Sequence, residues 1–99
     1  MSIHINGYSF EGPYSSTYSL RDNSGVYVII CNNNLIDVGE SASLKSRIEN
    51  HDRKDCWKRN CSGSISFAVY YTPHLQQSGR MEIEREIRRN HRNIPCGEI

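Results

Sequence analysis

The sequence predicts a small α/β domain in which a three-stranded antiparallel sheet is flanked by helices. A continuous apolar, β-branched run at residues 26–31 is typical of a buried strand. Residues 65–71 alternate between two sets of side chains, which is typical of a half-buried strand. Residues 75–93 have helical spacing, with Met81, Ile83 and Ile87 on or near the buried face. These patterns place strands and helices in one mixed domain.

The first half of the chain is expected to form a lead-in followed by two paired strands. Residues 1–23 are polar and rich in turn formers, so we expect an extended lead-in with one short strand around residues 8–10. After the strand at 26–31, three asparagines at 32–34 suit a tight turn because Asn tolerates positive φ. Residues 35–38 then form the return strand. This strand, the one at 26–31 and the one at 65–71 should belong to the same antiparallel sheet.

Helices are expected both before and after the last strand in the sequence. Gly39 lets the backbone bend or approach another group closely, and a helix follows over about residues 42–52, capped by Ser41 or Ser43. Arg47 and His51 lie four apart in this helix and therefore project from neighbouring positions on one face. Residues 53–61 suit a second short helix, and Pro95 ends the last one.

Length and composition indicate one globular domain over residues 1–99, with a lead-in at 1–23 and a motif-bearing core at 24–96. The hydrophobic share is 36% and the charged share is 23%, which excludes a disordered chain. No apolar run approaches the roughly 20 residues that span a bilayer, so no membrane partner is expected. Residues 1–7 lack the basic and apolar segments of a signal peptide. The expected location is therefore cytoplasmic.

The four cysteines are expected to be reduced, because disulfides are rare in proteins without a signal peptide. They are Cys31, Cys56, Cys61 and Cys96. Most simply they are small buried or half-exposed residues. Two disulfides are the alternative that an even count allows. Cys56 and Cys61, with His51 upstream, also suggest a zinc site, although no second matched pair supports it.

Basic residues are concentrated in the second half of the chain, although the net charge is only +1. Of the 12 Lys and Arg residues, only Arg21 precedes Lys45. A polyanion can be held by a local basic face of such a molecule. The alternative interpretation is a solvated surface on which Glu and Arg side chains pair.

Several short motifs in a fixed order resemble those of the GIY-YIG nuclease family. Residues 25–27 read Gly-Val-Tyr, and residues 37–39 read Asp-Val-Gly, which matches the second motif except at its tyrosine. Leu44, Arg47 and His51 resemble the basic helix of the family. Glu84, between Ile83 and Ile87, resembles its metal-binding glutamate. The resemblance covers about residues 24–96.

The resemblance implies a metal-dependent endonuclease that hydrolyses DNA phosphodiester bonds. One Mg²⁺ or Mn²⁺ would be held weakly by a single carboxylate and completed by substrate phosphate oxygens. Glu84 is the implied ligand, and Glu82 is the alternative. The implied catalytic residues are Tyr27, which orients or deprotonates water, Asp37, Arg47, which binds phosphate, His51, which relays protons, and Glu84.

Asp37 departs from the family pattern, since an ionised carboxylate cannot donate a hydrogen bond as a phenol does. It can serve as a base or a second metal ligand, or mark a domain that has lost catalysis. The alternative function is therefore a catalytically weak or inactive relative that binds nucleic acid or a protein partner. A third interpretation is a nuclease module that gains specificity from a protein partner. The expected DNA phosphate contacts are Lys45, Arg47, Arg53, Lys54 and Lys58.

Overall fold

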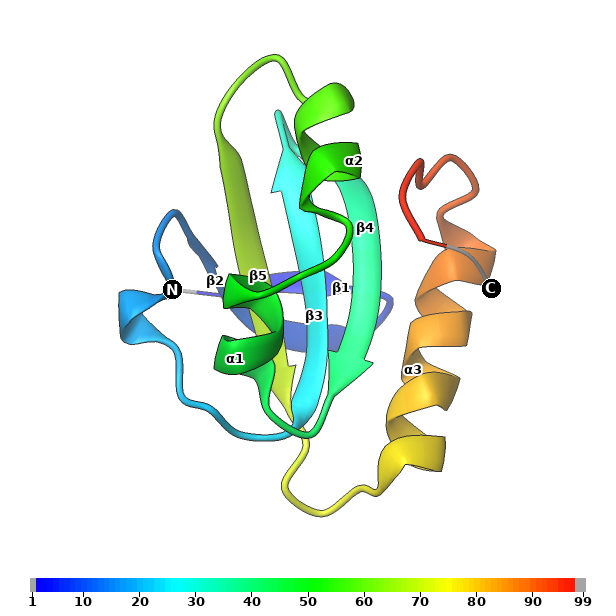
Figure 1. Ribbon diagram of the computed structural model, residues 1–99. Helices are drawn as coiled ribbons and strands as arrows, with labels where there is room; N and C mark the ends of the chain where they lie inside the picture. Colours follow the sequence, from blue (N-terminus) through cyan, green and yellow to red (C-terminus); the bar gives the residue numbers. More distant parts are fainter. Residues whose placement is uncertain (1, 98–99) are drawn as a thin grey trace.

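The computed structural model describes residues 2–97 and has an α/β fold built on a five-stranded antiparallel sheet. The strand order is β1-β2-β5-β3-β4, and helices lie against this sheet (Figure 1). The strands are β1 (Ser2–Ile5), β2 (Tyr8–Tyr14), β3 (Gly25–Cys31), β4 (Asn34–Ser41) and β5 (Ile65–Tyr71). The helices are a 3₁₀ turn, η1 (Thr17–Ser19), then α1 (Leu44–Glu49), α2 (Lys54–Arg59) and α3 (Gln77–Asn90).

The predicted sheet of three strands is confirmed at its centre but is too small. β3 pairs with both β4 and β5, as expected from the patterns at 26–31, 35–38 and 65–71. The lead-in was expected to supply one short strand, but it forms a hairpin, β1–β2, whose second strand pairs with β5. Asn6 and Gly7 have φ of 54° and 85°, the left-handed geometry of a two-residue hairpin turn. Phe10, fully buried, anchors this hairpin in the core.

The turn between β3 and β4 uses the asparagines as expected. Asn32 and Asn33 have φ of 51° and 68°, which few residues other than Gly and Asn adopt easily. The resulting register pairs Tyr27 with Gly39. It also pairs Ile29 with Asp37, and it shifts between Ile29 and Ile30. Tyr27 and Asp37 therefore lie diagonally across two neighbouring strands on the same face of the sheet.

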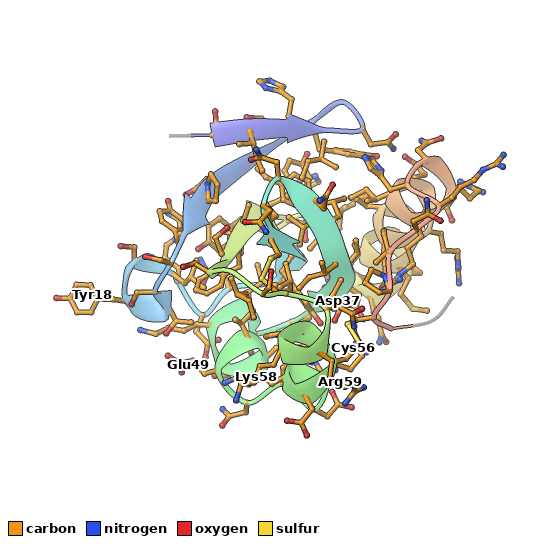
Figure 2. All side chains as sticks on the ribbon, turned by 90° about the horizontal axis from the view of Figure 1, so that it is seen from above. Tyr18, Asp37, Glu49, Cys56, Lys58 and Arg59 are labelled. Carbon is orange, nitrogen blue, oxygen red and sulfur yellow. A yellow bond between two sulfur atoms is a disulfide. The ribbon has the colours of Figure 1, made fainter. Side chains whose placement is uncertain are left out.

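Two cores lie on opposite faces of the sheet, and Figure 2 shows α1 and α2 on one side of it. On β3, Tyr27 and Ile29 face the core with Leu44 and Trp57 of α1 and α2. The alternate residues of β3 belong to the core that α3 covers with its buried Ile83 and Ile87. Met81 was expected on or near this buried face, but it is 36% exposed. α3 runs beside the edge strand β4 (Figure 1). It shields backbone groups that an exposed edge strand would offer to other chains.

The cysteines form two disulfides, so the expectation of reduced thiols is wrong. Cys31 at the end of β3 is bonded to Cys61, and Cys56 of α2 is bonded to Cys96 near the C-terminus. The partners are separated by 30 and 40 residues, so only the tertiary fold brings them together. The zinc alternative also fails, because Cys56 and Cys61 are in different disulfides and neither is a thiolate.

Within residues 2–97, no helix has the length and apolar composition needed to cross a membrane.

Candidate functional site

The predicted residues from β3, β4 and α1 meet at the face of the sheet that α1 and α2 cover. Tyr27 of β3 contacts His51, which follows α1. Asp37 of β4 lies next to them and binds Arg53, which precedes α2. The first motif, the second motif and the basic helix therefore come together in one place.

A hydrogen bond between Tyr27 Oη and His51 Nε2 lies at the centre of the site. The backbone N–H of Arg53 donates to His51 Nδ1 at 3.0 Å. Because Nδ1 accepts, we assign the imidazole hydrogen to Nε2, which then donates to the Tyr27 oxygen. The hydroxyl hydrogen of Tyr27 is therefore not used in this bond.

Burial keeps both of these groups neutral at pH 7. Burial raises the pKa of Tyr27 to about 12, although the positive charges of Arg53 and Arg47 lower it. Burial lowers the pKa of His51 to about 4, and the nearby Arg47 and Arg53 act in the same direction. A charged form of either group would lose hydration. The site therefore presents a phenol and a neutral imidazole.

Gly39 makes room for Tyr27. Gly39 faces Tyr27 across the β3–β4 pair, and a Cβ atom at this position would collide with the hydroxyl end of the tyrosine ring. The sequence predicts that the backbone here either bends or approaches another group closely, and the structure shows a close approach to the Tyr27 ring. A glycine is needed because the ring lies directly against the backbone.

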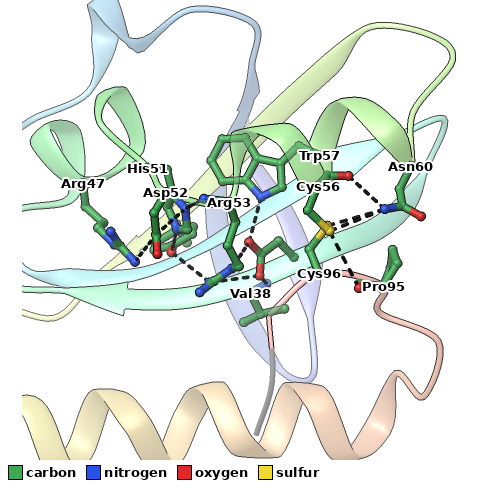
Figure 3. Close-up of polar contacts among 12 residues, drawn as sticks. Val38, Arg47, His51, Asp52, Arg53, Cys56, Trp57, Asn60, Pro95 and Cys96 are labelled. Carbon is green, nitrogen blue, oxygen red and sulfur yellow. Dashed lines mark hydrogen bonds and ion pairs between the residues drawn. A yellow bond between two sulfur atoms is a disulfide. The ribbon is translucent and has the colours of Figure 1, made fainter.

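Asp37 is fully buried, and both oxygens of its carboxylate accept hydrogen bonds. Oδ2 accepts from Arg53 Nε at 2.8 Å and from Trp57 Nε1 at 2.7 Å, and both of these donors are labelled in Figure 3. Oδ1 accepts from the Val38 amide at 2.8 Å, from Arg88 Nη2 at 3.0 Å and from Arg53 Nη2 at 3.2 Å. A carboxylate offers about four lone-pair positions. This arrangement suits an anchor for two arginines better than a base or a metal ligand.

Arg47 lies at the rim of the site. Its Nη2 is 3.0 Å from the Asp52 carboxylate, and its side chain is 35% exposed. Asp52 is 73% exposed, so this ion pair is weak and easily exchanged for another anion. Arg47 also affects the pKa values of both Tyr27 and His51, so its charge lies close to them. Arg47 is thus placed to bind a phosphate beside Tyr27.

Glu84 reaches the site through an arginine of its own helix. Its Oε2 accepts from Arg88 Nε at 3.3 Å, and Arg88 in turn binds Asp37. Burial raises the pKa of Glu84, while Arg88 opposes this rise. Glu82 points elsewhere, since it pairs with Arg85 and its side chain is 56% exposed. Of the two glutamates, Glu84 is the one connected to the site.

Glu84 fits the implied divalent cation in part. Its side chain is 20% exposed, and Oε1 makes no hydrogen bond with the described residues, so one oxygen is open to a cation. Arg88 competes with a cation for the other oxygen. Within residues 2–97, no three or more His, Cys, Asp and Glu side chains are grouped as a metal site. A cation here would therefore depend on Glu84, water and substrate oxygens.

Two residues of this network were not predicted from the sequence. Trp57 and Arg88 hold Asp37 from α2 and α3, and Arg88 also donates to the Val38 carbonyl oxygen and, at 3.2 Å, to the Cys96 carbonyl oxygen. Arg88 is 51 residues from Asp37 in the chain. A buried acidic residue on a strand does require cationic partners. That rule predicts that partners exist but does not say which arginine supplies them.

The expected DNA-contacting side chains all lie on α1, α2 and the link between them. Over residues 44–60, six Lys and Arg residues against three Asp and Glu residues give a local charge of +3. Lys54 and Lys58 are exposed, whereas Lys45, Arg47 and Arg53 are half-buried. Figure 2 shows Lys58 and Arg59 on the outer side of these helices. The positive charge is therefore concentrated on the side of the molecule where Tyr27 and His51 lie.

Two surface cavities, of about 440 and 350 Å³, lie elsewhere, near the turn between β3 and β4. Both are lined by Asn34, Leu35 and His91, and none of the predicted catalytic residues contributes to them. The candidate site therefore coincides with neither cavity, and its central residues Tyr27 and His51 are only 1% and 5% exposed.

No family model matches this chain, and no curated protein or solved structure is significantly similar to it. The resemblance to GIY-YIG nucleases therefore depends on the motif residues of the sequence alone.

Proposed function

We propose that this chain is a GIY-YIG-like domain that hydrolyses DNA phosphodiester bonds with one Mg²⁺ or Mn²⁺. The observation that carries the proposal is the contact of Tyr27 with His51 beside Arg47 and Arg53. Tyr27, Arg47 and His51 come from the motifs that resemble the family in sequence, whereas Arg53 was expected only as a DNA phosphate contact. A phenol, an imidazole and two guanidinium groups together can bind a phosphate and move a proton.

In this proposal Arg47, His51 and Tyr27 each have a separate role. Arg47 releases the exposed Asp52 and binds the scissile phosphate, helped by Lys54 and Lys58 at the surface. His51 holds the Tyr27 oxygen by donating from Nε2, so the phenol points in one direction. Tyr27 orients the attacking water and takes its proton when the phenol is ionised.

Glu84 would hold the cation through its open carboxylate oxygen. When bound, a divalent cation stabilises negative charge that develops on the phosphate and the departing oxygen. A cation bound to Glu84 would weaken the ion pair between Glu84 and Arg88. Arg88 would keep its contact with Asp37.

The test is cleavage of supercoiled and branched DNA by the oxidised protein with Mg²⁺ or Mn²⁺. Tyr27→Phe and Glu84→Gln should each lower the rate by about two to four orders of magnitude, the usual effect of losing a positioned acid, base or ligand. Glu82→Gln is the matched control, because Glu82 is exposed and should leave the rate unchanged. A full rate in Glu84→Gln with loss in Glu82→Gln would move the ligand to Glu82.

A second candidate function is binding of nucleic acid or a protein partner without cleavage. The observation that favours it is Asp37, whose oxygens are all engaged with Arg53, Arg88, Trp57 and Val38. A pKa of about 12 also leaves very little Tyr27 phenolate at pH 7. Wild type that binds DNA with a salt-dependent affinity but cuts nothing with either metal would establish this alternative. Salt-independent or absent DNA binding would favour a protein partner.

The disulfides bear on where the protein works. Two disulfides are rare in a reducing cytosol. The oxidised fold therefore favours an oxidising compartment over the cytoplasmic location expected from the sequence. Alkylation of thiols in rapidly quenched cells, followed by mass measurement, distinguishes the two locations.

A further inference from the structure

Arg53 connects the two sequence motifs physically. Its Nε donates to Asp37 Oδ2 at 2.8 Å, and its Nη2 donates to Asp37 Oδ1 at 3.2 Å. The same Nη2 lies 3.5 Å from Tyr27 Oη. A guanidinium carries five N–H groups in a rigid fork. One edge of Arg53 can therefore hold the carboxylate while another of its hydrogens points to the tyrosine oxygen.

Arg53 cannot move away from this position easily. Its carboxylate partner is fully buried and is also bound by Trp57 and Arg88. The backbone N–H of Arg53 is bound by His51 Nδ1. Both ends of the residue are therefore fixed, although 29% of the side chain is exposed. A charge fixed in advance stabilises a developing opposite charge without the cost of reorganisation.

We propose that the Asp37–Arg53 ion pair is the positioning device of Tyr27, in which Asp37 holds the guanidinium against the tyrosine oxygen so that negative charge on that oxygen is stabilised. This inference deepens the proposed function and rests on it for its catalytic meaning. In this role Arg53 is more than a phosphate contact, and Asp37 acts through Arg53 instead of accepting a proton itself.

In this mechanism Tyr27 gives one proton to solvent and takes one from the attacking water. Tyr27 first loses its hydroxyl proton to solvent, and the phenolate then takes a proton from the attacking water. The resulting hydroxide forms a bond to phosphorus, the bond from phosphorus to the departing oxygen breaks, and that oxygen takes a proton from solvent. Arg53 remains charged throughout and supports the phenolate between the first two transfers.

The other charged and titratable groups that face Tyr27 are Arg47, His51 and Asp37. Arg47 favours the phenolate, whereas the negative charge of Asp37 opposes it. On the remaining side, β5 places Val69 opposite Tyr27, which does not titrate. Without Arg53, the charge of Asp37 would act on Tyr27 with one cation fewer to balance it. Asp37 and Arg53 must therefore both be present for the pair to stabilise the Tyr27 phenolate.

The test replaces Tyr27 with a ring-fluorinated tyrosine, whose phenol is more acidic, and follows its ¹⁹F signal against pH without DNA or metal. Arg53→Gln should raise the pKa of this phenol by about 1–3 units, the usual effect of a charge within about 4–6 Å. Arg53→Lys keeps the charge but not the bidentate contact and should give an intermediate shift. Arg59→Gln, an equal charge change on exposed α2, should leave the value near that of the unchanged protein.

Cleavage gives a second measurement. Arg53→Gln should lower kcat at pH 7 by about 10- to 1000-fold, matching its phenol shift, and Arg53→Lys should restore part of it. Equal phenol pKa values in Arg53→Gln and Arg59→Gln, with both proteins folded by circular dichroism, would overturn the proposal. A phenol shift in a protein that cuts no DNA would support the positioning role and refute the nuclease function. The two failures are therefore distinguishable.

Discussion

Replacing Asp37 by Asn tests the buried network on which the site depends. The substitution nearly keeps the shape of the side chain but removes a negative charge that faces two arginines at 2.8 and 3.0 Å. Arg53 is 29% exposed and can regain water, whereas Arg88 is 5% exposed and cannot. Breaking a buried ion pair costs about 3–5 kcal/mol. Arg88 keeps Glu84 and two carbonyl oxygens, so we expect the lower value, about 3 kcal/mol.

The assay is urea unfolding of the oxidised protein, followed by circular dichroism at neutral pH. A domain of this size is stable by about 5–15 kcal/mol, so the loss should lower the midpoint by about 1–3 M urea with an unchanged slope. Glu82→Gln removes a carboxylate of an exposed ion pair and should change the free energy of unfolding by less than about 0.5 kcal/mol. An equally small change in Asp37→Asn would refute the reasoning that Asp37 is the anchor of this network.

Three further predictions concern the same site. The folded-state pKa of His51, about 4, lies below its ordinary value of 6.5, so its contribution to stability is complete above pH 6.5 and falls by about 3 kcal/mol as the pH drops to 4. His51→Gln should show a smaller decline in unfolding free energy over that range, and an identical decline would contradict the assignment. Replacing Cys56 and Cys96 together by Ser should lower the free energy of unfolding by about 4 kcal/mol, because their disulfide closes a loop with a separation of 40 residues. Thermal melts of both proteins without reductant measure this loss. A reductant that breaks only this disulfide should change the melting temperature of the double variant little. Gly39→Ala should displace the Tyr27 ring and cost about 1–3 kcal/mol by overpacking, measured by urea unfolding, and an unchanged midpoint would show that the ring has room to move.

The central strands could be predicted because their signals are local. The apolar run at 26–31 and the asparagines at 32–34 each depend only on neighbouring residues, and the structure forms β3, the turn and β4 there. The helix expected at 75–93 is α3, although it covers only Gln77–Asn90, and the one expected at 42–52 is α1, which covers only Leu44–Glu49. Helix ends fray and depend on caps, which are weaker signals than the periodic pattern between them.

The hairpin β1–β2 was underpredicted for the opposite reason. β1 has only four residues and β2 contains Gly12 and Pro13, which weaken the local strand signal. The segment becomes part of the sheet because β2 finds a partner in β5, far away in the chain. The Asn6-Gly7 pair was the available local signal, since this dipeptide favours the hairpin turn that the structure contains.

The sequence alone determined which residue types surround the candidate site: a tyrosine and an aspartate on paired strands, and a basic helix that follows them. Strand register, which is local, places Tyr27 and Asp37 on one face, but His51 lies beyond the end of α1, so helical spacing does not place it beside Arg47. Only the tertiary structure decided their partners. Asp37 is joined to Arg88 across 51 residues and to Trp57 across 20, and the cysteines pair across 30 and 40. Contacts of this kind depend on how α2 and α3 pack against the sheet, because a buried charge is stable only where that packing brings opposite charges to it.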